Sequence, residues 1–206
     1  MAKKKLPYDQ KYYDPEIECL PRPELEQLQL ERLKEMVRWS YDNAPYYKQA
    51  WDEAGVSPED IHTLKDIEKF PFIDKKTERE TQGVGSFFGG LCAVPEEDVV
   101  FMATSSGSTG VPTMSPFTQE DFDLWQDTEA RLFWQAGMRP TDRYVHGLNF
   151  ALYVGGPDVI GAQNLGATAI WVGAVPSDRL LFVLKHYQPT IIWTSPSYAW
   201  QLGNKA

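Results

Sequence analysis

The sequence is poor in the residues that build disulfide frameworks and metal sites. Its 206 residues include two cysteines, Cys19 and Cys92, and three histidines, His62, His146 and His186. None of these residues shows the C-x-x-C or H-x-x-x-H spacing that is typical of such sites. We therefore expect no disulfide framework and no metal site.

Positive charge is also scarce. Twenty Lys and Arg residues stand against 29 Asp and Glu residues, which gives a formal net charge of -9. Proteins that bind nucleic acid usually carry a basic face or stripe, and the short run of lysines at 3–5 is no such stripe. We therefore expect no nucleic-acid partner.

Long apolar runs are missing as well. No segment approaches the roughly 20 apolar residues of a membrane-spanning helix. The first residues, MAKKKLPYDQ, also lack the apolar stretch of a secretory signal. These features predict no membrane partner and a cytoplasmic location.

The chain is nevertheless rich enough in apolar residues to form a core, with 42% hydrophobic and 13% aromatic side chains. In the first part, Leu30, Leu33, Val37 and Tyr41 recur at helical intervals between charged residues. Proline and glycine then mark the ends of further short helices. We predict a helical N-terminal segment over residues 1–70.

From about Pro71 the chain changes to short apolar runs separated by glycine and proline. Candidate buried strands lie at 99–103, 144–150, 168–174 and 190–195, and candidate helices at 118–138 and 177–187. Strands that alternate with helices are typical of an α/β fold. We predict an α/β domain over residues 71–206, with a sheet that begins at the run 99–103.

The stretch TSSGSTGVPT follows the first of these strands and is rich in serine, threonine and glycine. Backbone N–H groups of such a loop can converge on an anion, and hydroxyl groups can add hydrogen bonds to phosphate oxygens. The stretch lacks the lysine of the Walker pattern, and the chain has neither a G-x-G-x-x-G nor a G-x-S-x-G motif. The residues alone leave a phosphate loop and an ordinary polar turn open.

The segment SSGSTGVPT closely resembles the phosphate-binding loop of adenylate-forming enzymes, in the form found in phenylacetate-CoA ligases and coenzyme F390 synthetases. Further blocks resemble that family in the same order: NAPYYK, FPFIDK, GVPTMSPFTQEDF, AGMRPTDR, VGG, NLGAT and SPSYA. The resemblance extends from about Tyr12 to Leu202.

The resemblance implies an ATP-dependent ligase that activates an aryl carboxylic acid. The acid would react with ATP to give an acyl-adenylate and pyrophosphate, and coenzyme A would then displace AMP to form a thioester, with Mg²⁺ accompanying the nucleotide. The β- and γ-phosphates would be held by Ser105, Ser106, Gly107, Ser108, Thr109 and Gly110, with Thr113 at the far end of the loop. Many adenylate-forming enzymes have lysine where this chain has Thr113, although the phenylacetate-ligase branch also tolerates threonine.

By the same resemblance, the segment HGLNFALYVGG lines the pocket for the acid. Phe150 and Tyr153 would lie against the substrate ring, and Gly155 and Gly156 would leave room for it. The alternative is that the two aromatic residues simply fill the core. Leu148 stands where the family often has tyrosine, so the acid need not be phenylacetate.

Three further candidates follow the last predicted strand, a usual place for ligand contacts in α/β sheets, although their role is implied mainly by the family resemblance. They are Pro196, Ser197 and Tyr198.

The family's segments for adenine and ribose, and its small C-terminal domain with the catalytic lysine, have no counterpart in the 206 residues. We therefore expect an N-terminal fragment with an incomplete AMP-binding domain, inactive alone and with its catalytic residues elsewhere. An unpaired sheet edge predicts self-association or binding to the missing C-terminal portion. The alternatives are a coenzyme F390 synthetase-like enzyme and a non-catalytic binding or assembly module that acts through a partner chain.

Overall fold

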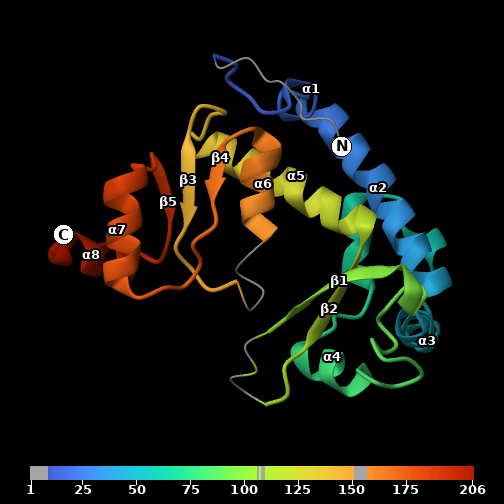
Figure 1. Cartoon of the computed structure of the whole chain (residues 1–206). Coiled ribbons are helices and arrows are strands. Elements are labelled where there is room, and N and C mark those ends of the chain that lie inside the picture. Colours follow the sequence, from blue (N-terminus) through green and yellow to red (C-terminus); the bar gives the residue numbers. More distant parts are fainter. Residues whose placement is uncertain (1–8, 106, 108–109, 151–156) are drawn as a thin grey trace. The chain divides into compact units, whose positions relative to one another are not determined.

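A computed structural model describes residues 9–105, 107, 110–150 and 157–206. The chain forms two compact units: the hairpin unit, Cys19–Glu120, and the sheet unit, Met1–Glu18 with Asp121–Ala206. Figure 1 labels the elements of both units. The boundaries between these units lie after residues 18 and 120, and not at residue 70. The division into domains 1–70 and 71–206 stays a prediction. In the part of the chain that is described, no helix is long and apolar enough to cross a membrane.

Two helices, α2 (Arg22–Asn43) and α3 (Pro45–Ala54), form the predicted helical part of the hairpin unit. Each begins with proline in its first turn, where the missing N–H costs no helical hydrogen bond. They pack around a cluster of buried side chains: Val37, Trp51, Ile61 and Phe70. The rings of Trp51 and Phe70 meet edge to face at 4.9 Å between centroids.

Short helical elements connect these helices to the strands of the hairpin unit. They are η1 (Pro58–Asp60), η2 (Leu64–Lys69), α4 (Lys75–Thr81) and η3 (Glu96–Asp98). Asp74 caps α4 by accepting a 2.8 Å hydrogen bond from the backbone N–H of Thr77.

The strands β1 (Val99–Thr104) and β2 (Met114–Thr118) form an antiparallel pair in which Thr104 lies opposite Met114. The prediction that the α/β sheet begins at residues 99–103 is therefore wrong. In β1, buried Ala103 alternates with exposed Val100 and Met102. This alternation is typical of an antiparallel ribbon with one covered face, rather than of a strand buried on both faces.

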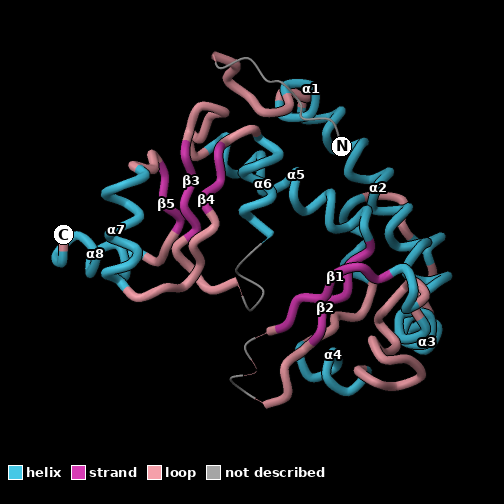
Figure 2. Tube along the Cα trace, in the orientation of Figure 1, coloured by secondary structure: helices cyan, strands magenta, loops and turns pink. Residues whose placement is uncertain are grey.

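The sheet unit contains a parallel sheet of three strands in the order β4-β3-β5. Its strands are β3 (Arg143–His146), β4 (Thr168–Ile170) and β5 (Ile191–Trp193). They appear in magenta in Figure 2. The predicted strands lie here but are shorter than their apolar runs. This sheet and its flanking helices confirm the predicted α/β class.

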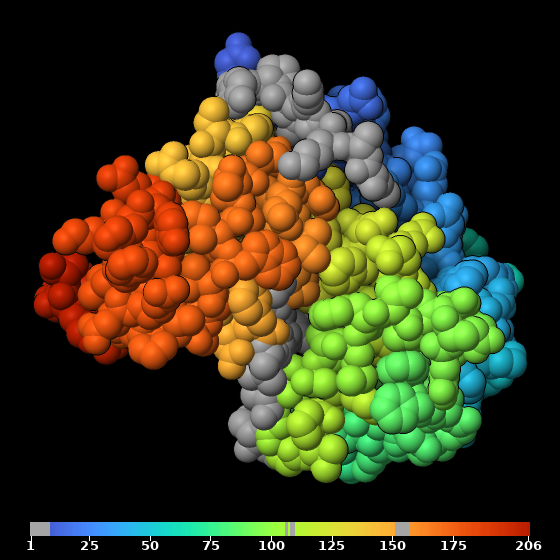
Figure 3. Space-filling view, in the orientation of Figure 1, coloured from blue at the N-terminus to red at the C-terminus, as the bar shows by residue number. Residues whose placement is uncertain are grey.

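Four helices cover the two faces of this sheet. Tyr144 packs with residues of α5 (Gln119–Gln135) and α6 (Pro157–Leu165). The next residue, Val145, packs with residues of α7 (Ser177–Tyr187) and α8 (Pro196–Lys205). Because successive strand residues point to opposite faces, each helix pair covers one face. Helices α7 and α8, orange-red and red in Figure 3, form part of the outer surface of the unit.

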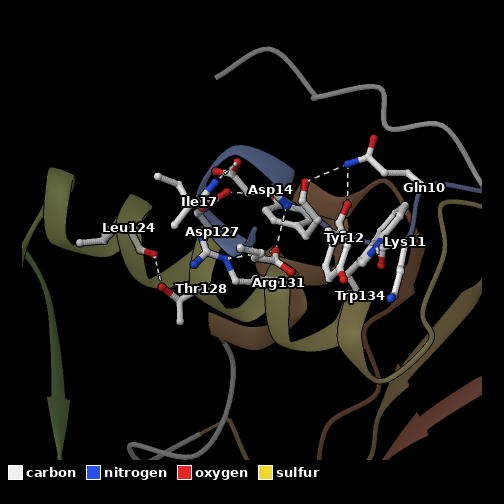
Figure 4. A network of polar contacts seen from close by, with 12 residues as sticks. Gln10, Lys11, Tyr12, Asp14, Ile17, Leu124, Asp127, Thr128, Arg131 and Trp134 are labelled. Carbon is white, nitrogen blue, oxygen red and sulfur yellow. Dashed lines mark hydrogen bonds and ion pairs between the residues drawn. The ribbon is translucent and has the colours of Figure 1, made fainter. Parts of the chain in front are cut away.

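The first described residues are also part of the sheet unit and pack on α5 (Figure 4). The hydroxyl of buried Tyr13, just before α1 (Pro15–Glu18), donates a 2.8 Å hydrogen bond to Asp127. The indole N–H of Trp134 donates to the carbonyl of Lys11 at 3.3 Å. Burial and the neighbouring Asp127 carboxylate raise the pKa of Tyr13. These contacts join the first residues to the rest of the unit.

The close packing of α5 on α6 depends on Gly161. A Cβ atom at this position would lie 2.6 Å from Cβ of Glu129 and 3.2 Å from the carbonyl oxygen of Gln126. We predict that Gly161→Ala lowers the free energy of unfolding by about 1–3 kcal/mol, as overpacking does elsewhere. Gly203 in α8, with open space around it, is the matched control: Gly203→Ala is expected to raise stability by up to about 1 kcal/mol. Denaturant unfolding of both variants checks this, and equal shifts would contradict it.

Candidate functional site

The loop between β1 and β2 is closed at its base by Ser105 and Thr113. The backbone N–H of Ser105 donates to the carbonyl of Thr113 at 3.0 Å. In return, the backbone N–H and the hydroxyl of Thr113 donate to the Ser105 hydroxyl at 2.9 and 3.1 Å. Thr113 is buried, with 4% of its surface exposed. These two predicted phosphate-site residues therefore fix the width of the loop, and Ser106, Ser108 and Thr109 lie outside the described residues.

Two glycines shape the described part of the loop. Gly107 has a φ of +67°, and a Cβ atom on it would lie 2.8 Å from Cγ of Pro112 and 2.9 Å from the carbonyl oxygen of Gly110. The backbone N–H of Gly110 donates to the Gly107 carbonyl at 3.0 Å. Gly110 has a φ of +136° and is exposed. A residue with a side chain is strained at either position, so glycine is required for this backbone path.

Gln82, directly after α4, holds the outgoing side of the loop. Its side-chain Oε1 accepts a 2.6 Å hydrogen bond from the backbone N–H of Met114, and its side-chain Nε2 donates to the backbone carbonyl of Pro112 at 3.3 Å. Gln82 has no signal in the sequence, because no local pattern connects a glutamine with a loop 30 residues later.

A separate cavity of about 620 Å³ in the hairpin unit lies between α3, α4 and the loop that precedes η3. Its lining includes Tyr46, Glu80, Val84 and Cys92, but no residue of the loop 105–113. We assign it no ligand.

A second candidate site lies at the carboxyl end of the parallel sheet. His146 ends β3, and its ring stacks on Phe150 at 4.8 Å between centroids and an interplanar angle of 21°. Phe150 stacks in turn on Trp171, the residue after β4, at 5.7 Å. Ligands in open α/β sheets bind at this end of the strands. Phe150 therefore lies at this end of the sheet, and its contact with the substrate stays a prediction, whereas Tyr153, Gly155 and Gly156 fall outside the described residues.

Gly173 makes room for the Phe150 ring. Its backbone N–H donates to the His146 carbonyl at 3.1 Å, and its φ is +69°. A Cβ atom at this position would lie 2.5 Å from Cε2 of Phe150. The glycine thus allows the loop after β4 to approach both rings.

His146 also belongs to a buried polar trio, defined as Tyr144, His146 and Asp158. Nδ1 of His146 and the carboxylate of Asp158 are 2.8 Å apart, and the Tyr144 hydroxyl donates to the same carboxylate oxygen. Tyr144 and His146 are fully buried, and Asp158 is 7% exposed. Burial, followed by the hydrogen bond and charge of Asp158, raises the pKa of Tyr144.

Several polar atoms around the trio lack a hydrogen-bond partner among the described residues. They are Nε2 of His146, Oδ1 of Asp158 and both amide atoms of Gln126. Orphaned buried polar atoms are rare in native proteins and call for an explanation, such as water or a ligand.

Pro196, Ser197 and Tyr198 form the first turn of α8. Ser195 caps this turn by accepting a 3.3 Å hydrogen bond from the backbone N–H of Tyr198. Tyr198 packs on the cluster that contains Val145, whereas Phe150 packs on the cluster that contains Tyr144. The three residues are thus tied to the opposite face of β3 from Phe150, and Pro196 and Ser197 are exposed.

No group of three His, Cys, Asp or Glu side chains in the described ranges is placed to hold a metal ion.

Comparison with known proteins places this geometry in context. No protein-family model matches the chain. It is 36% identical to a phenylacetate-coenzyme A ligase of Thermus thermophilus over 94% of its length, and 37% identical to one of Escherichia coli over 90%. It covers 42% of each of these relatives.

The similar solved structures are also those of a CoA ligase. A 2-hydroxyisobutyryl-CoA ligase in complex with 2-HIB-AMP and CoA matches 98% of the chain with a TM-score of 0.91 and 32% identity. An open conformation of that ligase matches with a TM-score of 0.89, and the chain covers 43% and 47% of the two structures.

The fold is therefore that of an adenylate-forming ligase. Within this class, the chain belongs to the phenylacetate-CoA ligase family, and it spans about 40% of the length of the curated relatives named above.

Glu129 provides a test of the electrostatics around the trio. Burial, together with the negative charge of Asp158, raises the pKa of Glu129. Its protonated form therefore stabilises the folded chain at low pH, and this contribution is lost as the pH rises through the folded-state pKa.

We predict that Glu129→Gln raises the free energy of unfolding at pH 7 by less than about 1 kcal/mol, since Glu129 is only half-buried and water screens its charge. The advantage is expected to vanish below the ordinary glutamate pKa of 4.5. Denaturant unfolding across this pH range, with exposed Glu35→Gln as the control, measures it. A benefit of Glu129→Gln that is independent of pH would refute the assignment.

Proposed function

We propose that this chain is part of an ATP-dependent ligase that joins an aryl carboxylic acid to coenzyme A. The acid carboxylate displaces pyrophosphate at the α-phosphate of ATP, and the CoA thiol then displaces AMP from the acyl-adenylate. Such transfers depend on positioning and charge stabilisation, so they require no protein nucleophile. The relatives named as CoA ligases support the reaction class.

The observation that carries this proposal is the geometry of the described residues of the loop 105–113, namely 105, 107 and 110–113. The Ser105–Thr113 hydrogen bonds close its base, and glycines with positive φ lie at 107 and 110. A glycine-containing backbone of this kind can direct successive N–H groups at one anion. The hydroxyl-rich composition adds donors for phosphate oxygens. These features support our assignment of the loop to the triphosphate of ATP.

For the acid, we propose the carboxyl end of the parallel sheet. Phe150 and Trp171 provide an aromatic surface that suits an aryl group, with one ring stacked on the other. Mg²⁺, when bound with ATP, supplies positive charge to the phosphates. We assign no described residue to coenzyme A, adenine or ribose.

The loop assignment is tested at Gly107. We predict that Gly107→Ala weakens ATP binding at least tenfold, or about 1.4 kcal/mol, because the added Cβ displaces the loop backbone. The control is Gly83→Ala, since Gly83 also has a positive φ, +71°, but has open space around it and lies outside the loop. This control accounts for the strain of a left-handed backbone.

Calorimetric titration of ATP into the longer ligase that contains this chain measures the affinities, after thermal melts show that both variants are folded. Equal ATP affinities for wild type and a folded Gly107→Ala variant would overturn the phosphate assignment.

A further inference from the structure

The imidazole of His146 is held in one orientation by two contacts, and a third holds its backbone. Nδ1 lies 2.8 Å from the Asp158 carboxylate, the ring face stacks on Phe150, and the backbone carbonyl accepts from Gly173. Tyr144 donates its hydroxyl to the same carboxylate and so fixes the position of Asp158. A ring held in this way has little freedom to turn.

These contacts determine the role of the other ring nitrogen. A carboxylate oxygen only accepts hydrogen bonds, so Nδ1 of His146 carries the proton that it donates to Asp158. In the neutral imidazole, Nε2 therefore holds a lone pair and is an acceptor. This atom is buried and has no partner among the residues described. Leaving a buried acceptor unpaired costs free energy, so this atom calls for a hydrogen-bond donor.

We infer, building on the proposed function, that Nε2 of His146 accepts a hydrogen bond from a hydroxyl group of the acid substrate, so that the ligase selects hydroxylated acids. Asp158 and Tyr144 are positioning residues that keep Nε2 in its acceptor form. Because the imidazole belongs to the row of stacked rings His146, Phe150 and Trp171, an aryl acid held beside this row can present a ring or side-chain hydroxyl to this nitrogen.

A hydroxyl group suits this nitrogen better than the substrate carboxylate does. A carboxylate oxygen would meet the Nε2 lone pair with its own, whereas a hydroxyl donates a hydrogen bond without a change of charge. The carboxylates of Asp158 and Glu129 already lie on the two helices packed against this face of β3. A site built to bind a hydroxyl discriminates strongly against an analogue that lacks it, because the acceptor is then left unpaired.

The acceptor state is tested by nitrogen-15 NMR of the histidines in the 206-residue chain. The sequence has three histidines, so the signal lost in His146→Asn identifies His146. We expect a protonated Nδ1 and an unprotonated Nε2, and loss of this fixed tautomer in Asp158→Asn. A mixture of tautomers in the wild-type chain would overturn the positioning role of Asp158.

Selectivity is tested in the longer ligase with phenylacetate, mandelate and the ortho-, meta- and para-hydroxyphenylacetates. His146→Asn is the informative variant, because its amide can still donate to Asp158 while the Nε2 acceptor is removed. We expect at least one hydroxylated acid to exceed phenylacetate tenfold or more in kcat/KM. In His146→Asn this preference is expected to disappear, with the KM for ATP unchanged. His186→Asn, at an exposed histidine of α7, is the matched control.

The outcomes separate the two proposals. Absence of acyl-CoA from every acid with the wild-type ligase would refute the proposed function. Acyl-CoA formation with no preference for any hydroxylated acid, or an equal loss for all acids in His146→Asn, would refute only the selection by His146, and would leave water as the partner of Nε2.

Discussion

The architecture of the sheet unit depends on the burial of β3 on both faces. Tyr144, Val145 and His146 have no exposed surface, and they point alternately to the two helix layers. A central parallel strand must be covered in this way, because each face presents side chains that water would otherwise contact. The strand thereby places two polar side chains, Tyr144 and His146, in the buried layer between the sheet and helices α5 and α6.

Asp158 provides the hydrogen-bond acceptor that these two buried polar side chains need. It lies in the first turn of α6, directly where that helix packs on β3, and it accepts hydrogen bonds from both polar residues of the strand. Gly161, one turn later, lets α6 approach α5 closely. The same short helix thus provides both the close contact with α5 and the hydrogen-bond acceptor for the two polar residues of β3. Nε2 of His146 has no partner among the described residues.

Local sequence patterns predicted the amphipathic helices, but not the helix that lacks a hydrophobic period. Helix α2 was predicted from its apolar stripe, and helix α7 from its place between two candidate strands. Helix α6 was not predicted, since most of its residues are buried and it has no polar face to give a period. The run 99–103 was assigned to the wrong sheet, because the sequence of a strand does not determine with which other strand it pairs.

The candidate sites show the same limit. The composition of residues 105–113 and the family resemblance located the loop, but not the hydrogen bonds by which Ser105, Thr113 and Gln82 shape it. Phe150 was predicted as a pocket residue from the family resemblance, whereas Asp158 and Gly173 meet it and His146 only through the fold. Residues brought together by long-range packing leave no signal in a local sequence window.

The central claim is that the carboxyl end of this sheet binds the acid, with Phe150 against its ring and His146 as the hydrogen-bond acceptor. A crystal structure of the longer ligase with a stable hydroxyaryl acyl-adenylate analogue tests it most directly. The account predicts that the aryl group lies on Phe150 and that its hydroxyl is within hydrogen-bond distance of Nε2 of His146. An acyl group bound elsewhere, with Nε2 paired to ordered water, would contradict the account.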